Sequence, residues 1–277
     1  RPVSGVIASV LTPHTPRMAV EETAPEFVRP LIAGSRELGD WIRGLEPDCL
    51  VLQSTHWVCT FNWYATAQPV PEGLCVAEEA PDMIPGLPYR HPGHPAFAAD
   101  LAAYASAQGV PFLLNTSEHY RWDYAAYVPL RYIDPDGTLP VVNLPTVIMA
   151  DLAESMRVGR LVDETARARG ERVVYIASTA LSHALVRGPD RWPTDERRAL
   201  DDEFVGKLEA GEFATLIEWL PEYARAGVAE MGGRVVAGFL GALSAMADRP
   251  CGARRFGAYA QSSGSGNLSI ALSPTLA

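Results

Sequence analysis

Cysteine is scarce in this chain of 277 residues, and its four copies are scattered. They are Cys49, Cys59, Cys75 and Cys251, and no two of them form a C-x-x-C pair. A disulfide-stapled small domain, a redox dithiol and a thiolate zinc site are therefore not expected. We interpret the four thiols as packing residues, because free cysteine behaves as a small buried hydrophobe.

The sequence also lacks a long apolar run and an excess of positive charge. Its longest apolar stretch, residues 235–246, is shorter than the roughly 20 residues that a membrane helix needs, so no membrane partner is expected. Asp and Glu number 33 against 23 Lys and Arg, which disfavours nucleic acid as a partner. No small-residue cleavage site follows the apolar N-terminal segment, so we expect a cytoplasmic protein. A small-molecule substrate fits these absences best.

What the sequence does contain is an alternation of short apolar runs and helical patterns. Strand-length runs rich in β-branched residues and apolar on successive positions predict strands that are covered on both faces. They lie at residues 3–11, 49–53, 139–144 and 172–178. Helical periodicity occupies residues 27–45, 95–108 and 149–169. This order predicts an α/β sandwich with a largely parallel central sheet flanked by helices.

One segment, residues 68–95, departs from this pattern because proline and glycine are dense in it. We expect an irregular loop there, and such loops often shape or cover a binding site. No linker, internal repeat or low-complexity tract divides the chain. Residues 1–277 are therefore predicted to form a single domain.

Three of the six histidines occupy matching places in this predicted fold. His14, His56 and His183 each follow a predicted strand, in SVLTPHTP, VLQSTHW and YIASTALSH. Ligands of open α/β sheets bind beyond the carboxyl ends of the strands, so these three imidazoles could share one crevice. Two imidazoles and one carboxylate form the facial triad of non-haem Fe(II) oxygenases, which leaves positions open for substrate and O2. A third histidine could then act as an acid or base.

The carboxylate is harder to place, because 33 acidic residues compete for the role. Glu230 stands out, since it precedes two glycines and an apolar helix in YARAGVAEMGGRVVAGFL. Glycines there would let the backbone approach a buried site closely, although a solvated helix acid fits the same pattern.

Five segments taken together resemble a known family. SVLTPHTP, QSTHW, YRWDYAAYVPLRYI, IASTALSHAL and LPEYARAGVAEMGGRVVAGFLGAL are similar, in this order and spacing, to the class III (LigB-type) extradiol ring-cleaving dioxygenases. Within that family, the likeness is strongest to the catalytic β subunit of 2-aminophenol 1,6-dioxygenase. The resemblance runs from Gly5 to about Asn267 and includes YAQSSGSGN. It implies a LigB-like fold, Fe(II) as the cofactor, and a small aromatic substrate and O2 as the reactants.

The resemblance also assigns individual residues. It makes His14, His56 and Glu230 the iron ligands and His183 the acid/base residue beside the substrate. Tyr124 stands where many catechol-cleaving members have a histidine, whereas the aminophenol-type members resemble this chain in having a tyrosine. The resemblance therefore favours an aminophenol as the substrate. Ala125 departs from the glycine of the aminophenol enzymes.

Three further histidines are candidates for the substrate pocket. His91 and His94 come with the divergent segment GLPYRHPGHP and either line the pocket or lie exposed in a loop. His119 either supports the site or has a structural role. The resemblance also implies an oligomer, made of identical chains or of this chain with a homologous subunit.

Two other functions remain open from the sequence. A non-catalytic homologous subunit would share the fold, although retention of all four candidate residues argues against it. A zinc-dependent hydrolase on the same scaffold is the other alternative, since two histidines and one glutamate also suit zinc.

Overall fold

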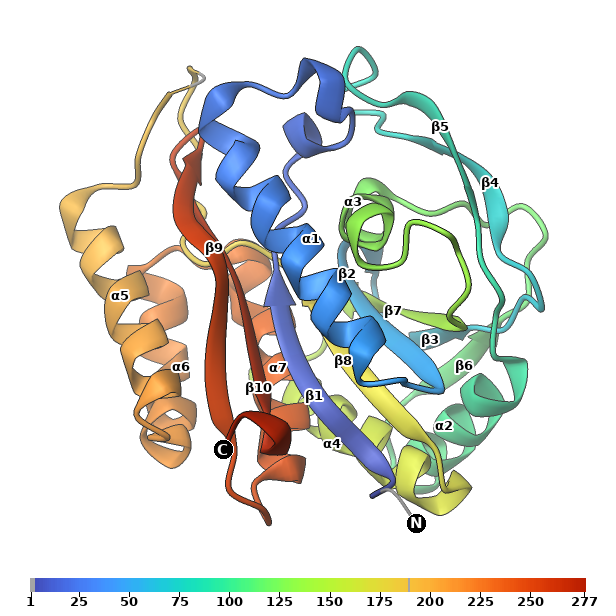
Figure 1. Ribbon diagram of the computed structural model, residues 1–277. Helices are drawn as coiled ribbons and strands as arrows, with labels where there is room; N and C mark the ends of the chain where they lie inside the picture. Colours follow the sequence, from blue (N-terminus) through green and yellow to red (C-terminus); the bar gives the residue numbers. More distant parts are fainter. Residues whose placement is uncertain (1–2, 189) are drawn as a thin grey trace.

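The computed structural model describes residues 3–188 and 190–277. Its central feature is a six-stranded sheet in the order β7-β2-β8-β1-β10-β9 (Figure 1). The strands are β1 (Gly5–Thr12), β2 (Cys49–Cys59), β7 (Val141–Val147), β8 (Arg172–Ser178), β9 (Gly252–Ser262) and β10 (Ser265–Ser273). The pairs β7-β2, β2-β8 and β8-β1 are parallel, whereas β10 is antiparallel to both β1 and β9. The predicted α/β class with a mostly parallel sheet is confirmed.

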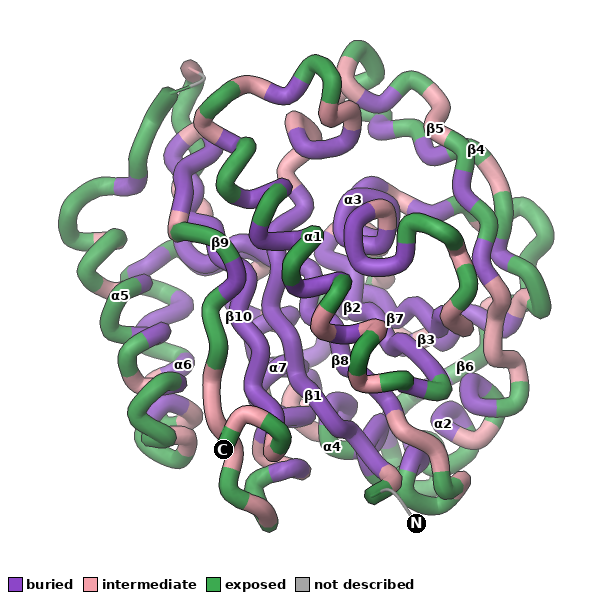
Figure 2. Tube along the Cα trace, viewed as in Figure 1, coloured by how far each residue is buried: buried purple, intermediate pink, exposed green. Residues whose placement is uncertain are grey.

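Helices cover both faces of this sheet (Figure 1). They are α1 (Arg29–Gly44), α2 (Pro95–Ala107), α3 (Tyr124–Ile133), α4 (Leu152–Arg169), α5 (Asp195–Glu209), α6 (Phe213–Ala226) and α7 (Arg234–Met246). Along β8, Val173 and Tyr175 belong to one apolar cluster with α4 and α7, while Val174 and Ile176 belong to another with α1 and α3. Successive side chains of a strand point to opposite faces, so a strand covered on both sides must be apolar throughout. Figure 2 shows these central strands as buried along nearly their whole length.

The predicted strands and helices agree with the structure within about three residues, except that β2 continues to Cys59 and α3 was not predicted. The antiparallel pair β9 and β10 was not predicted, because β10 is rich in serine and most of β9 is exposed or half-buried before its last three residues. Two small sheets complete the fold: β3 (Trp63–Thr66) with β6 (Phe112–Asn115), and β4 (Glu72–Val76) with β5 (Pro85–Arg90). None of the described helices is long and apolar enough to cross a membrane. That residues 1–277 form one domain stays a prediction.

The proline-rich segment differs from the irregular loop that the sequence predicts. Strands β4 and β5 form an antiparallel hairpin there, with Glu72 opposite Arg90 and Cys75 opposite Leu87. Proline is tolerated because, among the strands that the structure describes, β4 and β5 pair only with each other, so the outer edge of each needs no backbone donor. Figure 1 shows the hairpin arching over the side of the sheet that carries α3.

The register of the parallel strands brings three of their carboxyl ends together. Thr12 of β1 lies opposite Ser178 of β8, and Ser54 of β2 also pairs with Ser178. The segments that leave these strands therefore start from one edge of the sheet. This is the edge at which open α/β sheets bind their ligands.

Candidate metal centre

His14 leaves β1 two residues after the strand ends, and its side chain is 5% exposed. Its Nδ1 lies 3.1 Å from Oγ of Ser178, and that hydroxyl donates its hydrogen to the carbonyl of Ala125 at 2.5 Å. Because the hydroxyl has one hydrogen to give, it must accept from Nδ1–H of His14. This leaves Nε2 of the neutral imidazole with a free lone pair, as a metal ligand requires.

His56 reaches the same place from an irregularity in β2. The pairing of β2 with β7 shifts register between Gln53 and Val58. At this point the Ser54 hydroxyl accepts hydrogen bonds from the backbone of His56 and Trp57 at 3.1 and 3.2 Å. Irregularities of this kind re-aim a side chain next to active sites. Burial, together with the nearby His14, lowers the pKa of His56 to about 4, so its imidazole stays neutral near pH 7 and can bind a metal.

Glu230 begins a short turn before α7 in which the backbone runs left-handed. Met231, Gly232 and Gly233 have φ values of 49°, 66° and 81°, which explains the two glycines after the glutamate. The carboxylate is 3% exposed, and its Oε1 accepts hydrogen bonds from the Ala180 amide at 2.8 Å and the Thr179 hydroxyl at 3.3 Å. Its Oε2 is directed toward the histidines.

The three histidines surround that second oxygen. Oε2 of Glu230 lies 3.4 Å from Nε2 of His14, 3.8 Å from Nε2 of His56 and 3.1 Å from Nε2 of His183. Burial raises the pKa of Glu230, but the nearby His14 and His183 and the hydrogen bond from the Ala180 amide bring it well below its usual range. Glu230 is therefore a buried carboxylate that keeps its negative charge and can bind a metal.

His183 lies in the turn after β8 and is held by its backbone. Its amide donates to the carbonyl of Val228 at 2.9 Å, and it forms an isolated bridge with Ser265. Next to it, Ser182 is bonded through both its amide and its hydroxyl to the buried carboxylate of Asp201 at 3.1 and 2.7 Å. These backbone contacts hold the segment of His183 in place, and its imidazole, 28% exposed, lies at the mouth of the site.

Tyr124 is the first residue of α3 and packs against the histidines. Asp123 caps this helix by accepting from the amides of Ala125 and Ala126, which fixes the start of the helix. The ring centroid of Tyr124 lies 4.2 Å from that of His56 and 5.7 Å from that of His14. Burial raises the pKa of its hydroxyl, so the group keeps its proton and remains a donor.

These residues line a cavity of about 410 Å³. Small-molecule sites typically enclose about 300–1,000 Å³. The turn between β4 and β5 contributes Glu79, Ala80 and Met83 to the wall, and the segment after β1 contributes Arg17. Neither Glu79 nor Arg17 was predicted as a site residue. The available signal was weak: Glu79 is a charged residue in the proline-rich segment, and Arg17 is a charged residue just after the SVLTPHTP motif.

The other three predicted histidines lie elsewhere. His91 is 6% exposed, with Nδ1 3.4 Å from Asp134, and it borders a separate cavity. His94 caps α2 and contacts Glu171, which precedes β8 and so lies at the opposite end of the sheet. His119 is 88% exposed and lies near Glu118. The structure therefore does not bring these three into the cavity of His14.

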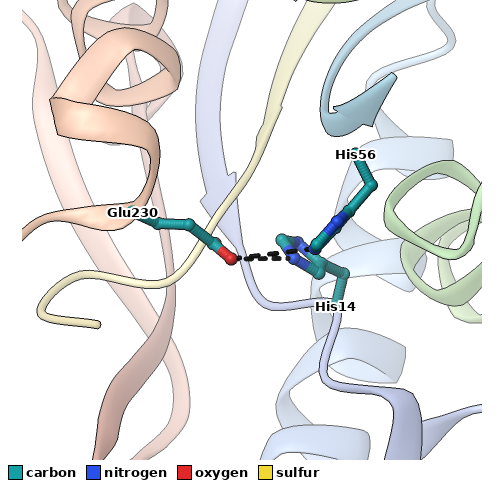
Figure 3. A group of neighbouring side chains, drawn as sticks. All are labelled: His14, His56 and Glu230. Carbon is teal, nitrogen blue, oxygen red and sulfur yellow. Dashed lines mark ion pairs between the residues drawn. The ribbon is translucent and has the colours of Figure 1, made fainter. Parts of the chain in front are cut away.

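Figure 3 shows how His14, His56 and Glu230 converge from separate elements. One ligand atom from each lies within 4.8 Å of the other two. Ligand atoms that share one metal ion at about 2.1 Å lie roughly 3 Å apart, so a small contraction would complete a site. The donor set of two neutral imidazoles and one ionised carboxylate fits a divalent metal that keeps further positions open.

Comparison with known proteins points to aromatic ring-opening dioxygenases. The family model described as the catalytic LigB subunit of aromatic ring-opening dioxygenase matches residues 8–262. A 3,4-dihydroxyphenylacetate 2,3-dioxygenase from Escherichia coli is 24% identical over 200 residues, which cover 70% of this chain and 72% of that protein. The 2-aminophenol 1,6-dioxygenase beta subunit of a Pseudomonas species is 25% identical over 197 residues, covering 64% of this chain and 63% of the subunit.

A solved structure supports the fold alone. The crystal structure of an uncharacterized protein from Escherichia coli K12 matches with a TM-score of 0.69 and 19% identity, covering 96% of this chain and 99% of that one. The narrower likeness to the aminophenol enzyme is not supported, because the dihydroxyphenylacetate enzyme is about equally similar. The family itself is shown: this chain belongs to the LigB family of catalytic subunits of aromatic ring-opening dioxygenases.

Proposed function

We propose that the protein is a non-haem Fe(II)-dependent extradiol dioxygenase that opens the ring of a 2-aminophenol- or catechol-type substrate. The observation that carries the proposal is the convergence of His14, His56 and Glu230 in the cavity. Two imidazoles and one carboxylate form the facial triad that non-haem Fe(II) oxygenases use. When bound, iron would coordinate two neighbouring donor groups of the ring and provide the electron path to O2.

Iron fits the reaction better than zinc does. The donor set alone suits either metal, but zinc has no redox chemistry. Activation of O2 for ring opening requires a metal that can exchange electrons. Because the chain belongs to a family of dioxygenases, whose reaction consumes O2, a zinc-dependent hydrolase is disfavoured. The same family match, to catalytic subunits, disfavours a non-catalytic subunit.

His183 is proposed as the acid/base residue. Its Nε2 lies 3.1 Å from Oε2 of Glu230, so its imidazole borders the proposed metal position without belonging to the group of ligands. From there it can take the proton of a ring hydroxyl as the substrate binds, and later return it to an oxygen of the product. An imidazole suits both steps because its ordinary pKa lies close to neutral pH.

Tyr124 is proposed to contact the ring. It lines the cavity beside His56, and its phenol keeps its proton. It can therefore donate a hydrogen bond to a ring substituent or pack against the ring face. This position supports either a hydroxyl or an amino group as the second donor, so both substrate types stay in the proposal.

Oxygen uptake tests the function directly. The protein, reconstituted anaerobically with Fe(II), is given catechol, 2-aminophenol or their ring-substituted derivatives together with isotopically labelled O2. We expect one O2 consumed per ring opened, with both labelled atoms in the product. Ring opening that consumes no O2, or no turnover of any member of either series, would overturn the proposal. Whether the active form is an oligomer stays a prediction, measured by light scattering.

A further inference from the structure

We propose that Arg17 selects substrates whose ring carries a carboxylate side group, which it binds while the ring lies at the metal centre. This inference rests on the proposed function and names a finer substrate class for the same site. It concerns a residue to which neither the family resemblance nor the sequence pattern gave a role.

The position of Arg17 is the first observation. It lies three residues after His14, in a short helical turn at residues 16–18. It lines the cavity of the metal centre, and it also lines a neighbouring cavity of about 500 Å³. Pro16 and Met83 line both cavities as well. In Figure 1 the blue segment after β1 and the hairpin β4–β5 meet above the sheet, where these residues come from. A group attached to a ring at the metal centre would therefore meet Arg17 at the border between the two cavities.

The bonding of Arg17 is the second observation. Its Nη1 atom is buried and has no hydrogen-bond partner among the residues that the structure describes. Its guanidinium lies over the ring of Phe27 at 5.6 Å, which limits where the side chain can go. Arg17 as a whole is half-buried, but a buried donor without a partner is unfavourable. A ligand acceptor that meets this nitrogen after a small rotation of the guanidinium would remove that penalty.

The other charges of the cavity are already engaged. Glu230 faces the three histidines, and the second acid, Glu79, lies 3.6 Å from Nδ1 of His56. Glu79 also lies close to Tyr124, and its negative charge helps burial to raise the pKa of that hydroxyl. Apart from the imidazoles, Arg17 is the cation among the described residues that line this cavity. An anionic substituent therefore finds one cationic partner here that is not already bound.

A carboxylate is the anion that fits best. The planar guanidinium offers paired donors that match the two oxygens of a carboxylate, which a lysine could not do. One relative is named for 3,4-dihydroxyphenylacetate, a catechol with such a group, whereas 2-aminophenol has none. Within the proposed function, Arg17 thus favours a catechol that carries a carboxylate side group.

The test uses two catechols that differ in one charge. They are 3,4-dihydroxyphenylacetate and 4-methylcatechol, and the measured quantity is the ratio of their kcat/KM values in wild type, Arg17→Met and Arg17→Lys. Arg225→Met is the matched control, since Arg225 is an exposed arginine on α6, away from the cavity. The ratio of the two dissociation constants, from anaerobic calorimetry, provides a second readout that needs no turnover.

We expect wild type and Arg225→Met to favour the acid by about 10- to 100-fold, the range of a charge-assisted contact. In Arg17→Met the preference for the acid should be at least tenfold smaller, both in kcat/KM and in binding. Arg17→Lys should show a preference between those of Arg17→Met and wild type. A wild type with no preference for the acid, or a ratio that Arg17→Met leaves intact, would overturn the role of Arg17 while ring opening itself stands. If wild type opens neither catechol, the binding ratio still decides the role of Arg17, and the proposed function is then tested separately with the aminophenol series.

Discussion

Glu230 is the residue on which the metal centre depends most. One of its carboxylate oxygens is held by the Ala180 amide and the Thr179 hydroxyl, so the other is presented to the imidazoles in a fixed direction. Such outer contacts orient a metal ligand before the ion arrives. His14 is oriented in the same way by Ser178, whose hydroxyl also determines which nitrogen stays free.

His183 differs from the ligands in its expected effect. We predict that His183→Ala keeps its iron but lowers kcat by about 100- to 10,000-fold, the usual contribution of a general acid or base. Iron content and kcat are measured on the same preparation, with the exposed His119→Ala as the control variant. Loss of iron in His183→Ala would instead make this residue a ligand, and an unchanged kcat would remove its proposed role.

His91 shows why a histidine in an unusual segment need not belong to the active site. It is buried beside Asp134, and its ring packs 5.1 Å from that of Trp122. Asp134 in turn accepts hydrogen bonds from the backbone of Thr138 and Leu139, each at 2.8 Å. This carboxylate therefore ties the end of α3 to the segment that leads into β7.

The Asp134 carboxylate gives a pH-dependent prediction. Burial raises its pKa, but the neighbouring His91 imidazole and the hydrogen bond from the Leu139 amide outweigh this and lower it below its ordinary 3.8. A carboxyl whose pKa is lower in the folded than in the unfolded protein stabilises the fold at pH values above its unfolded pKa. This contribution is lost as the pH falls through the folded pKa. Asp134→Asn should therefore reduce the free energy of unfolding by about 1–3 kcal/mol at pH 7.

Urea unfolding of wild type and Asp134→Asn, measured at intervals from pH 7 down to pH 3, checks this. The difference between the two proteins should be constant above about pH 5 and shrink below about pH 4. A difference that grows toward acid pH would show that the carboxylate is not stabilised in its charged form.

At the scale of elements, helices α4 and α7 pack with almost no space between their backbones. A Cβ added to Gly241 would lie 1.9 Å from the carbonyl oxygen of Met156, and one added to Gly159 would lie 2.3 Å from that of Gly238. Such distances are impossible without moving a helix. Because Glu230 lies in the turn that leads directly into α7, this packing also sets the position of a metal ligand.

Substitution of Gly241 tests that packing. We predict that Gly241→Ala lowers the free energy of unfolding by about 3 kcal/mol or more, since the overpacked backbone cannot yield easily. Gly206→Ala is the matched control: it is also helical, nothing lies within 4 Å of its added Cβ, and it should raise stability by about 0.5–1 kcal/mol. Equal effects of the two substitutions, measured by chemical unfolding, would contradict the close approach of α4 and α7.

The parallel strands were predictable at this scale because both of their faces are buried and their residues are apolar in succession. Strand β10 was not, since its serines satisfy their hydroxyls locally or against neighbouring strands, as Ser273 does with the carbonyl of Ile7. The hairpin β4–β5 was hidden for another reason: Pro85 and Pro88 lie on β5, which pairs with β4 alone among the described strands, so a missing donor on its other edge does no harm.

At the scale of the whole molecule, the metal centre joins three distant parts of the sequence. Because β1, β2 and β8 end at one edge of the sheet, the positions of His14, His56 and His183 could be foreseen from the strand pattern. Glu230 could be singled out only weakly from its own segment, since a solvated helix acid fits the two glycines equally well, and the family resemblance was needed to choose it among 33 acidic residues. Its place depends on α7 returning across the sheet, which is a property of the complete fold.

Iron content after anaerobic reconstitution with Fe(II) tests the central claim most directly, because it asks whether these distant residues form one site. Wild type, His14→Ala, Glu230→Ala and the control His119→Ala are desalted and their iron is measured per chain. We predict about one iron in wild type and in the control, and almost none in the two ligand variants. Full iron retained by Glu230→Ala or His14→Ala would contradict the assigned metal centre.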